Sequence, residues 1–452
     1  MKSSKSARQR SRQRCRRFTE CLGQFLTPEV LKQARRARGR RRRSPRWEVQ
    51  TLLWVVLTMT WCTGDSTPER FETARAFYIA CHEKRRRPGE THQGLQDALA
   101  KLPTAVLRGV AAGVRKQIAL RMSDRLLTWN WIVLGCDGSR NECPRSAQLE
   151  QRLGSVGKDR SAPGLWITAF VHLRTGLLWS WRLGKGNASE QRHLSQMLVT
   201  LPRRALVVTD AAYHGYELAQ QIVHSGASFL ARMSSKVRLY VDEETPLENF
   251  REGVVYYWPQ DRQRNGEPPL KLRLIRVRAA RRKRDVWLLT DVLDAERLTA
   301  PMAAQFYRWR WENEGLFRTY KHTLNKVKLV SRTVRLVHRE AESALLAVQL
   351  LLAQGTLAIP VARSSWNEPA VASPRRVLIE VRREIRETAA PRRRRSLRAR
   401  LGKATRERRN RHSGKVKRAW PRRKDHRPPK PPRILTLTAD QKALRDETLA
   451  AA

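Results

Sequence analysis

WNWIVLGCDG, residues 129–138, is an apolar run that ends in an acid and a glycine. A short run rich in branched and aromatic residues, closed by turn-forming residues, is typical of a buried strand. Downstream, GLWITAFVHL (164–173) and LLWSWRL (177–183) are separated by RTG and predict a hairpin. A helix (189–202), a strand ALVVTD (205–210), a helix (215–226) and a strand SFLAR (228–232) follow. Strands that alternate with helices in this way predict an α/β core.

The segments that flank this core differ in hydrophobic periodicity, and the changes in period suggest domain boundaries. The periodicity is helical before residue 128, β-like between 234 and 298, and helical again from 299. In the helical region, TPERFETARAFYIACHEK (67–84) has Thr67 as the expected N-cap and Pro68 at the first helical position. We therefore predict a basic N-terminal arm (1–45), a helical, DNA-end-binding region (46–128), a core in two parts (129–233 and 299–355), a β-rich insertion (234–298), and a basic, partly disordered tail (356–452) with a terminal helix from about Thr438.

Charge is the strongest global feature of the chain. The formal net charge is +51 over 452 residues. Residues 1–46 carry +15 and residues 391–430 carry +17, which leaves about +19 on the remaining 366 residues. The body is therefore basic as well as the ends, and such a surface needs counter-charge, most commonly nucleic acid. A structural, RNA-binding basic protein remains an alternative at this point.

Several classes of protein are disfavoured by what the sequence lacks. The best apolar run, residues 51–62, is shorter than the roughly 20 residues that a membrane-spanning helix needs. The six cysteines form no CxxC pair, so neither a zinc finger nor a disulfide framework is expected, and a reducing cytoplasm fits. No G-x-x-x-x-G-K-[ST] loop is present, so no nucleotide cofactor is expected.

Two acids follow apolar strands in the core. Asp137 closes the first strand and Asp210 closes ALVVTD. An Asp turn or cap would explain either residue alone, but functional groups gather at strand ends in open α/β sheets. Two like charges held close together are costly unless a cation binds between them. This pair therefore predicts a metal site.

A third acid comes from YRWRWENEGLFRTYK, residues 307–321. On one continuous helix of about 100° per residue, Tyr307, Arg310, Glu314 and Lys321 share an arc of about 60° beside the apolar face. Glu312 falls almost opposite. An i,i+4 ion pair between Arg310 and Glu314 is the ordinary interpretation, but with the two aspartates a three-carboxylate site for Mg²⁺ or Mn²⁺ is better supported. Two such ions can activate a nucleophile and stabilise the leaving oxygen of a phosphodiester.

The spacing of these residues is similar to a known signature. Tyr307-x2-Arg310-x3-Glu314-x6-Lys321 resembles the Tyr-Arg-Glu-Lys signature of the insertion-sequence-4 family of DDE transposases. LGCDGS around Asp137 and VVTDAAYHGY around Asp210 look like the first and second acidic motifs of that family. The resemblance covers about residues 129–354.

The resemblance implies a ribonuclease H-like core whose catalytic, metal-binding triad is Asp137, Asp210 and Glu314. It implies that Tyr307, Arg310 and Lys321 grip phosphates at the transposon end. In the family a tryptophan of the inserted β domain stacks on a flipped base, and Trp287 in VWLLT has the matching context. A core aromatic is the alternative for Trp287. Arg232 is a candidate phosphate contact, or an ordinary surface arginine.

The function that the resemblance implies is cut-and-paste DNA transposition. Its partners would be the double-stranded DNA of the terminal inverted repeats and of the target, with a homodimer assembled on DNA. The setting would be the bacterial cytoplasm, at the nucleoid. Two alternatives remain open: a ribonuclease H-like nuclease without strand transfer, and a catalytically silent DNA-binding derivative.

Overall fold

A computed structural model describes residues 2–39, 46–154, 161–244, 246–278, 285–359, 370–388, 401 and 430–451. Its chain divides into two compact units. Unit 1 comprises residues 1–127, 138–188 and 312–406, and unit 2 comprises residues 128–137, 189–311 and 407–452. The fold is mixed α/β, as the alternation of strands and helices predicts. Each unit is described by itself below.

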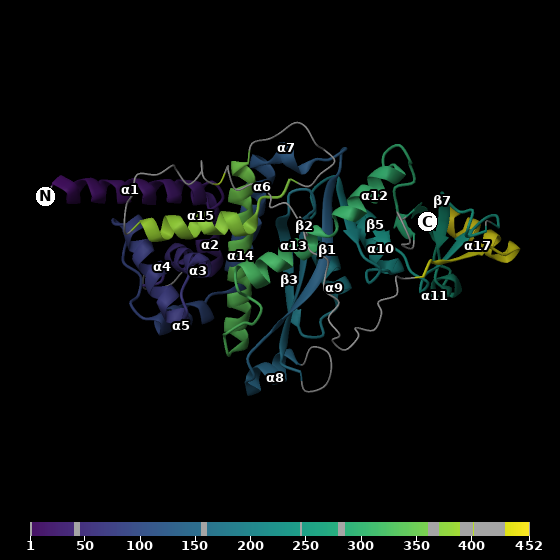
Figure 1. The fold of residues 1–452 in the computed structure, drawn as a ribbon. Helices are drawn as coiled ribbons and strands as arrows, with labels where there is room; N and C mark the ends of the chain where they lie inside the picture. The colour runs from purple at the N-terminus through teal and green to yellow at the C-terminus, as the bar shows by residue number, and fades with distance from the viewer. Residues whose placement is uncertain are drawn as a thin grey trace, which may run out of the picture. The chain divides into compact units, whose positions relative to one another are not determined.

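Unit 1 is built around one long apolar helix, α14 (Val334–Ala358). Helices α1, α3, α5, α6 and α15 pack against it (Figure 1). By length and composition α14 could cross a membrane, the one helix in the described residues that passes this test, but 89 % of its apolar window is buried inside the protein. Its burial is that of a core helix. The surrounding helices are α1 (Lys2–Gly23), α2 (Pro28–Arg38), α3 (Val49–Trp61), α4 (Thr67–Cys81), α5 (His92–Ala100), α6 (Thr104–Arg121), α7 (Ser123–Leu126), α8 (Ala147–Leu153) and α15 (Pro374–Glu387).

The N-terminal region is more helical than the sequence analysis predicts. Residues 2–23, within the predicted basic arm, form the 22-residue helix α1. Helix α2 begins after Thr27, whose side chain accepts from the Val30 amide. The expected N-cap Thr67 is wrong by one residue, because Ser66 has the extended backbone and accepts from the Glu69 amide. These caps satisfy amides that a helix start leaves without partners.

The strands of unit 1 are the second half of β1 (Ile132–Glu142), then β2 (Gly164–His172) and β3 (Leu177–Lys185), in that order. Strands β2 and β3 form the predicted antiparallel hairpin. A bulge between Phe170 and Val171 interrupts its register.

Unit 2 carries the longer run of strands, in the order β10-β6-β7-β8-β9-β5-β4-β1. Strands β4 (Ala205–Thr209) and β5 (Ser228–Arg232) lie parallel to each other, and β4 lies parallel to β1. The segment predicted as a β-rich insertion contains β6 (Arg238–Val241), β7 (Glu252–Tyr257), β8 (Leu270–Val277) and β9 (Val286–Thr290), which continue the sheet from β5 by antiparallel pairing. The helices of this unit are α9 (Glu190–Met197), η1 (Leu198–Thr200), α10 (Tyr216–His224), α11 (Gln260–Arg264), α12 (Ala300–Trp309) and α17 (Ala439–Ala450).

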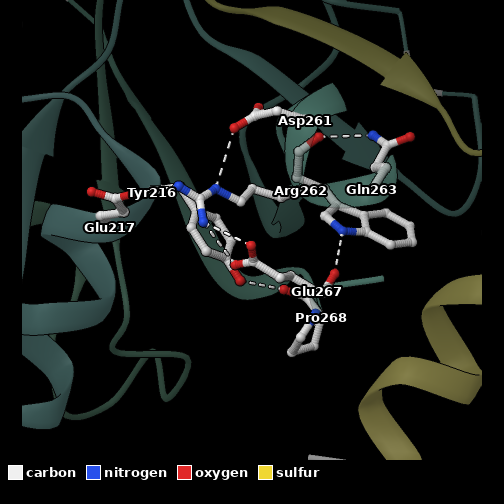
Figure 2. Close-up of polar contacts among 8 residues, drawn as sticks. Tyr216, Glu217, Asp261, Arg262, Gln263, Glu267 and Pro268 are labelled. Atoms are coloured by element: carbon white, nitrogen blue, oxygen red, sulfur yellow. Dashed lines mark hydrogen bonds and ion pairs between the residues drawn. The ribbon is translucent and has the colours of Figure 1, made fainter. Parts of the chain in front are cut away.

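A cluster of acids around Arg262 joins the insertion to the core of unit 2 (Figure 2). Arg262 of α11 forms ion pairs with Glu267 and with Glu217 of α10, and its guanidinium lies over the Tyr216 ring. The Tyr216 hydroxyl donates to the Pro268 carbonyl. These contacts tie α10, which follows Asp210, to the turn between β7 and β8.

The described part of the C-terminal region differs from a simple tail. Helix α15 packs on α14 within unit 1. Strand β10 (Arg433–Thr436) lies parallel to β6, and Leu437 joins a small buried cluster with Tyr240, Tyr256 and Trp258. The terminal helix is confirmed: α17 begins after Thr438, which forms a capping box with Gln441. Most of the basic stretch 391–430 lies outside the described residues.

Candidate active site

The two aspartates lie at one level on neighbouring parallel strands. In the register of β1 and β4, Gly135 pairs with Val208. Asp137 and Asp210 each come two residues later, so both lie at the same end of the paired segment. Paired strands are about 4.8 Å apart. Both side chains are half-buried. The pairing of these two acids at the carboxyl ends of parallel strands is what the sequence analysis predicts.

One detail of that prediction is wrong. Strand β4 ends at Thr209, directly before Asp210, but β1 does not end at Asp137. It continues to Glu142, and the second half belongs to unit 1. The glycine after Asp137 therefore does not terminate the strand, because the following residues still find pairing partners in β2.

The loop after Asp210 is fixed by hydrogen bonds from two directions. The Ala212 amide donates to Asp210 Oδ1 at 2.8 Å, which forms a turn around the carboxylate. Gln191 of α9 donates from Nε2 to the Ala212 and His214 carbonyls at 2.8 and 3.1 Å. The Asp210 carboxylate is therefore oriented by its own loop.

Tyr213 lies in this loop and is 4 % exposed. Its hydroxyl donates to Glu190 Oε2 at 2.5 Å, and it also hydrogen-bonds with the Cys136 thiol. Burial raises the pKa of Tyr213 and of Cys136 well above their usual values, so both stay protonated.

The segment from Tyr307 to Lys321 is not one helix, so the helical-face prediction is wrong. Helix α12 ends at Trp309, Arg310 and Trp311 form a turn, and α13 (Glu312–Arg318) begins anew. A π-helical turn, η2 (Thr319–Thr323), carries Lys321. A break and a wider turn both change the angle per residue.

The two glutamates of this segment differ in exposure. Glu312, which a continuous helix would place almost opposite Glu314, is 6 % exposed. Glu314 is exposed. The accessible carboxylate is therefore that of Glu314. The reason is its exposed position on α13, and not a shared arc with Tyr307 and Arg310 on one continuous helix. Glu314 lies in unit 1, whereas Asp137 and Asp210 lie in unit 2.

Tyr307 and Arg310 present buried polar atoms at the end of α12. This helix packs against β4 and β8. The Tyr307 hydroxyl and Arg310 Nε are buried and have no hydrogen-bond partner within the described part of the chain. The Arg310 guanidinium lies 5.6 Å from the Tyr307 ring centre and 5.6 Å from that of Trp311. Two unpartnered donors at one helix end suit an anionic oxygen.

Lys321 is half-buried in η2. Burial, together with the nearby positive charge of Arg140, lowers its pKa below the usual lysine value. Two cations close together are unfavourable unless an anion joins them. This neighbourhood therefore also fits a phosphate.

Trp287 and Arg232 lie on the sheet of unit 2. Trp287 in β9 is 5 % exposed, packs against Phe250 and lies under the Arg276 guanidinium at 5.3 Å. Its indole is therefore covered, which favours the core-aromatic alternative. Arg232 ends β5 opposite Leu288, with a half-buried side chain.

The acids of this region offer part of the ligand set of a divalent metal. Within the described residues, no group of three or more His, Cys, Asp or Glu side chains could hold an ion. The pair Asp137 and Asp210 supplies two hard oxygen donors at one level, which fits Mg²⁺ or Mn²⁺ as part of a ligand set. Neighbouring histidine and thiol groups do not suit the set: His214 Nδ1 hydrogen-bonds with the Ala211 carbonyl, and burial raises the pKa of Cys136, which disfavours the thiolate that would ligate a metal.

Sequence reasoning missed two features of this region. Glu190 and Gln191 begin α9 and hold the Asp210 loop, a role that no spacing pattern announces because α9 and the loop are joined through space. Trp311, in the turn after α12, has an indole that is 54 % exposed beside Arg310. An exposed indole next to a cation can stack on another planar group. Its exposure could not be predicted from the sequence, because it depends on the helix break beside it.

Comparisons with known proteins bear on the same part of the chain. Residues 138–350, slightly under half of the chain, match the family model described as the transposase DDE domain. That range includes Asp210 and Glu314 and begins one residue after Asp137. The match supports a transposase of the DDE kind, which is a nucleic-acid-cleaving enzyme.

No curated protein matches the sequence significantly. A solved structure described as a piggyBac transposase synaptic complex with hairpin DNA aligns with a TM-score of 0.41 and 14 % identity, over 86 % of this chain and 85 % of that chain. A score at this level does not establish a common fold.

Proposed function

We propose that this protein is a cut-and-paste DNA transposase of the insertion-sequence-4 type, with Asp137, Asp210 and Glu314 as its catalytic acids. The observation that carries the proposal is the pair Asp137 and Asp210 at one level of parallel strands, within and beside a region that matches the transposase DDE domain. The Tyr307, Arg310, Glu314 and Lys321 spacing supports the finer family assignment. A ribonuclease H-like core is the fold that this assignment implies.

The acids would hold divalent metal ions, Mg²⁺ or Mn²⁺. Transposase DDE domains generally use divalent metals. When bound, two such ions supply an activated water and stabilise the oxygen that leaves phosphorus. The chain contributes the carboxylates and the fixed orientation of the Asp210 loop.

The reaction follows from the chemistry of a phosphodiester. Water attacks phosphorus at the element's end, the bond from phosphorus to the 3′ oxygen breaks, and a 3′-hydroxyl and a 5′-phosphate result. That hydroxyl then attacks the opposite strand to give a hairpin, and after resolution it attacks target DNA. Each step breaks one phosphate ester bond and forms either another ester bond or the P–O bond of a water molecule. No nucleotide cofactor is consumed.

Cationic side chains would grip the DNA backbone. The Tyr307 hydroxyl and Arg310 Nε, which are buried and have no hydrogen-bond partner within the described residues, would contact phosphate oxygens once DNA binding exposes them. Lys321, whose pKa is lowered by burial and by the charge of Arg140, would add a further cationic contact. The core-wide positive charge would add sequence-independent affinity.

We further propose that two copies assemble on the terminal inverted repeats, with residues 46–128 reading the repeat sequence. Two ends must be joined in one complex, so a dimer formed on DNA is the simplest assembly. The free cysteines are consistent with a reducing bacterial cytoplasm, where the protein would associate with the nucleoid.

A cleavage assay with the full chain tests the proposal. The substrate is a supercoiled plasmid that carries the DNA on both sides of the coding region, including its inverted repeats, incubated with and without Mg²⁺. We expect metal-dependent nicks at the repeat ends, a hairpin product and, with target DNA present, joined products. Asp210→Asn serves as the catalytically silent control.

The alternatives give different products. Metal-dependent cutting without any joined product would indicate a nuclease. Binding of the repeats without nicking would indicate a DNA-binding derivative. Preference for RNA over the repeats would indicate a basic structural protein, and any of these three results would overturn the proposal.

A further inference from the structure

The buried phenol of Tyr213 connects both aspartate-bearing strands to a helix. Tyr213 follows Asp210 by three residues, and its amide donates to the Asp210 carbonyl at 3.3 Å. Its side chain runs from this loop to Cys136, the residue before Asp137 on β1, and to Glu190 on α9. One side chain therefore contacts the loop of one acid and the strand of the other.

Helix α9 supplies the other half of this connection through its first turn. Glu190 accepts from the Tyr213 hydroxyl, and the adjacent Gln191 donates to the Ala212 and His214 carbonyls. Ser189 caps the helix by accepting from the Arg192 amide, which fixes the turn that carries both residues. Three hydrogen bonds from consecutive α9 residues thus hold the loop.

From these contacts we propose that Tyr213 and Glu190 are positioning residues, which set the separation and orientation of the Asp137 and Asp210 carboxylates for a divalent metal. This inference rests on the proposed function. Neither side chain is a metal ligand in it, because the phenol lies between Cys136 and Glu190 and its hydrogen is used by the carboxylate. The role is that of an outer group that orients ligands.

A matched tyrosine separates positioning from ordinary packing. Tyr216 is three residues further along, is also buried, and donates to the Pro268 carbonyl at 2.5 Å. Its hydroxyl contacts the turn between β7 and β8, and not the loop or strand of either aspartate (Figure 2). Tyr213→Phe and Tyr216→Phe therefore remove the same atom at similar burial, with different predicted consequences.

The test measures Mn²⁺ binding to the full chain in complex with repeat DNA, by isothermal titration. We expect Tyr213→Phe to weaken Mn²⁺ binding by roughly 10- to 100-fold, the range typical of lost outer-shell partners. Tyr216→Phe should bind Mn²⁺ as the wild type does, and both variants should bind repeat DNA within about twofold of wild type. Thermal unfolding of each variant shows whether it is folded.

Glu190 offers a rescue test. Glu190→Gln keeps an oxygen that can accept from Tyr213, whereas Glu190→Ala removes it. We expect Glu190→Ala to resemble Tyr213→Phe, and Glu190→Gln to recover most of the Mn²⁺ affinity. The comparison also reveals whether the charge or the hydrogen bond of Glu190 matters.

The outcomes are distinguishable from failure of the proposed function. If wild type binds Mn²⁺ and Tyr213→Phe binds it equally well, the positioning role is wrong while the transposase proposal stands. Equal losses in Tyr213→Phe and Tyr216→Phe would show a general packing effect and would also overturn it. If wild type binds no Mn²⁺ at all, the proposed metal chemistry fails and this inference fails with it.

Discussion

The strand pair that carries Asp137 and Asp210 and the segment that carries Glu314 and Lys321 are supported in opposite ways. The aspartates sit on paired parallel strands, and the loop after Asp210 is held by hydrogen bonds from α9. Glu314 lies on a seven-residue helix between a turn and a π-helical turn. Helix α13 and the π-helical turn η2 both depend on packing against the rest of the protein, because such short helices have little stability of their own.

This difference suggests a division of labour within the proposed site. Ladder hydrogen bonds fix strand positions, so the aspartate pair is preorganised. A short helix between irregular turns has few ladder hydrogen bonds of its own, so we infer that the segment from Arg310 to Thr323 is the more adjustable part. Binding DNA would then act mainly on the second region.

The largest expected effect comes from the rigid region. Asp137→Asn and Asp210→Asn should each lower DNA cleavage by at least about 10³-fold, because a neutral amide is a poor ligand for a divalent metal. DNA binding and thermal unfolding should change little, since both side chains are only half-buried. The measurement is nicking of repeat DNA with gel-shift and calorimetric controls. Retention of cleavage by either variant would remove that aspartate from the site.

The two glutamates of the adjustable region should respond differently. Glu314→Gln should lower cleavage about as much as the two aspartate variants do. It should leave thermal unfolding unchanged, because the side chain of Glu314 is exposed. Glu312 is buried, so Glu312→Gln should instead lower stability by roughly 1–3 kcal/mol and leave folded protein able to cut. Nicking at a temperature where both variants are folded separates the effects. Loss of cleavage in a fully stable Glu312→Gln would reverse the roles assigned to the two residues.

The same contrast explains what the sequence could and could not predict. The β-strand alternation and the acids that follow apolar runs depend on local period and composition, so the order of strands and helices along the chain from β1 to β5 is predictable, as is the grouping of Asp137 with Asp210. The insertion strands are predictable for the same reason. The terminal helix follows from its capping box.

Predictions that needed information from distant residues failed. The break at Arg310 separates two buried residues, Trp309 and Glu312, and a projection with a constant 100° per residue assumes that no such break exists. Helix α1 has little apolar content, yet Phe18 and Leu22 pack in a buried interior. Strand β10 pairs with β6 across almost 200 residues, so no local signal could reveal it. The contact between Glu190 and Tyr213 is likewise nonlocal.

Trp287 tests whether a sheet residue acts through packing or through DNA. Its indole is buried, so Trp287→Ala should destabilise folding by about 3–5 kcal/mol. Trp287→Phe, which keeps an aromatic core residue, should leave DNA cleavage within a few-fold of wild type. Denaturant unfolding and nicking are the two measurements. A stable Trp287→Phe that loses cleavage completely would show that the indole is uncovered and used on DNA.

The smallest expected effect lies in the adjustable region, at Lys321. Lys321→Ala should weaken repeat binding only a few-fold, and it should lower the slope of log affinity against log salt by about 0.9, one phosphate contact. Because burial and Arg140 lower the pKa of Lys321, its proton is lost at a lower pH than for an ordinary lysine, so wild-type affinity should fall as pH rises through that lowered pKa. Lys321→Arg keeps its charge over this range and should flatten the pH dependence. If the salt slope of Lys321→Ala equals that of wild type, Lys321 does not contact phosphate, and the π-helical turn that carries it has another purpose.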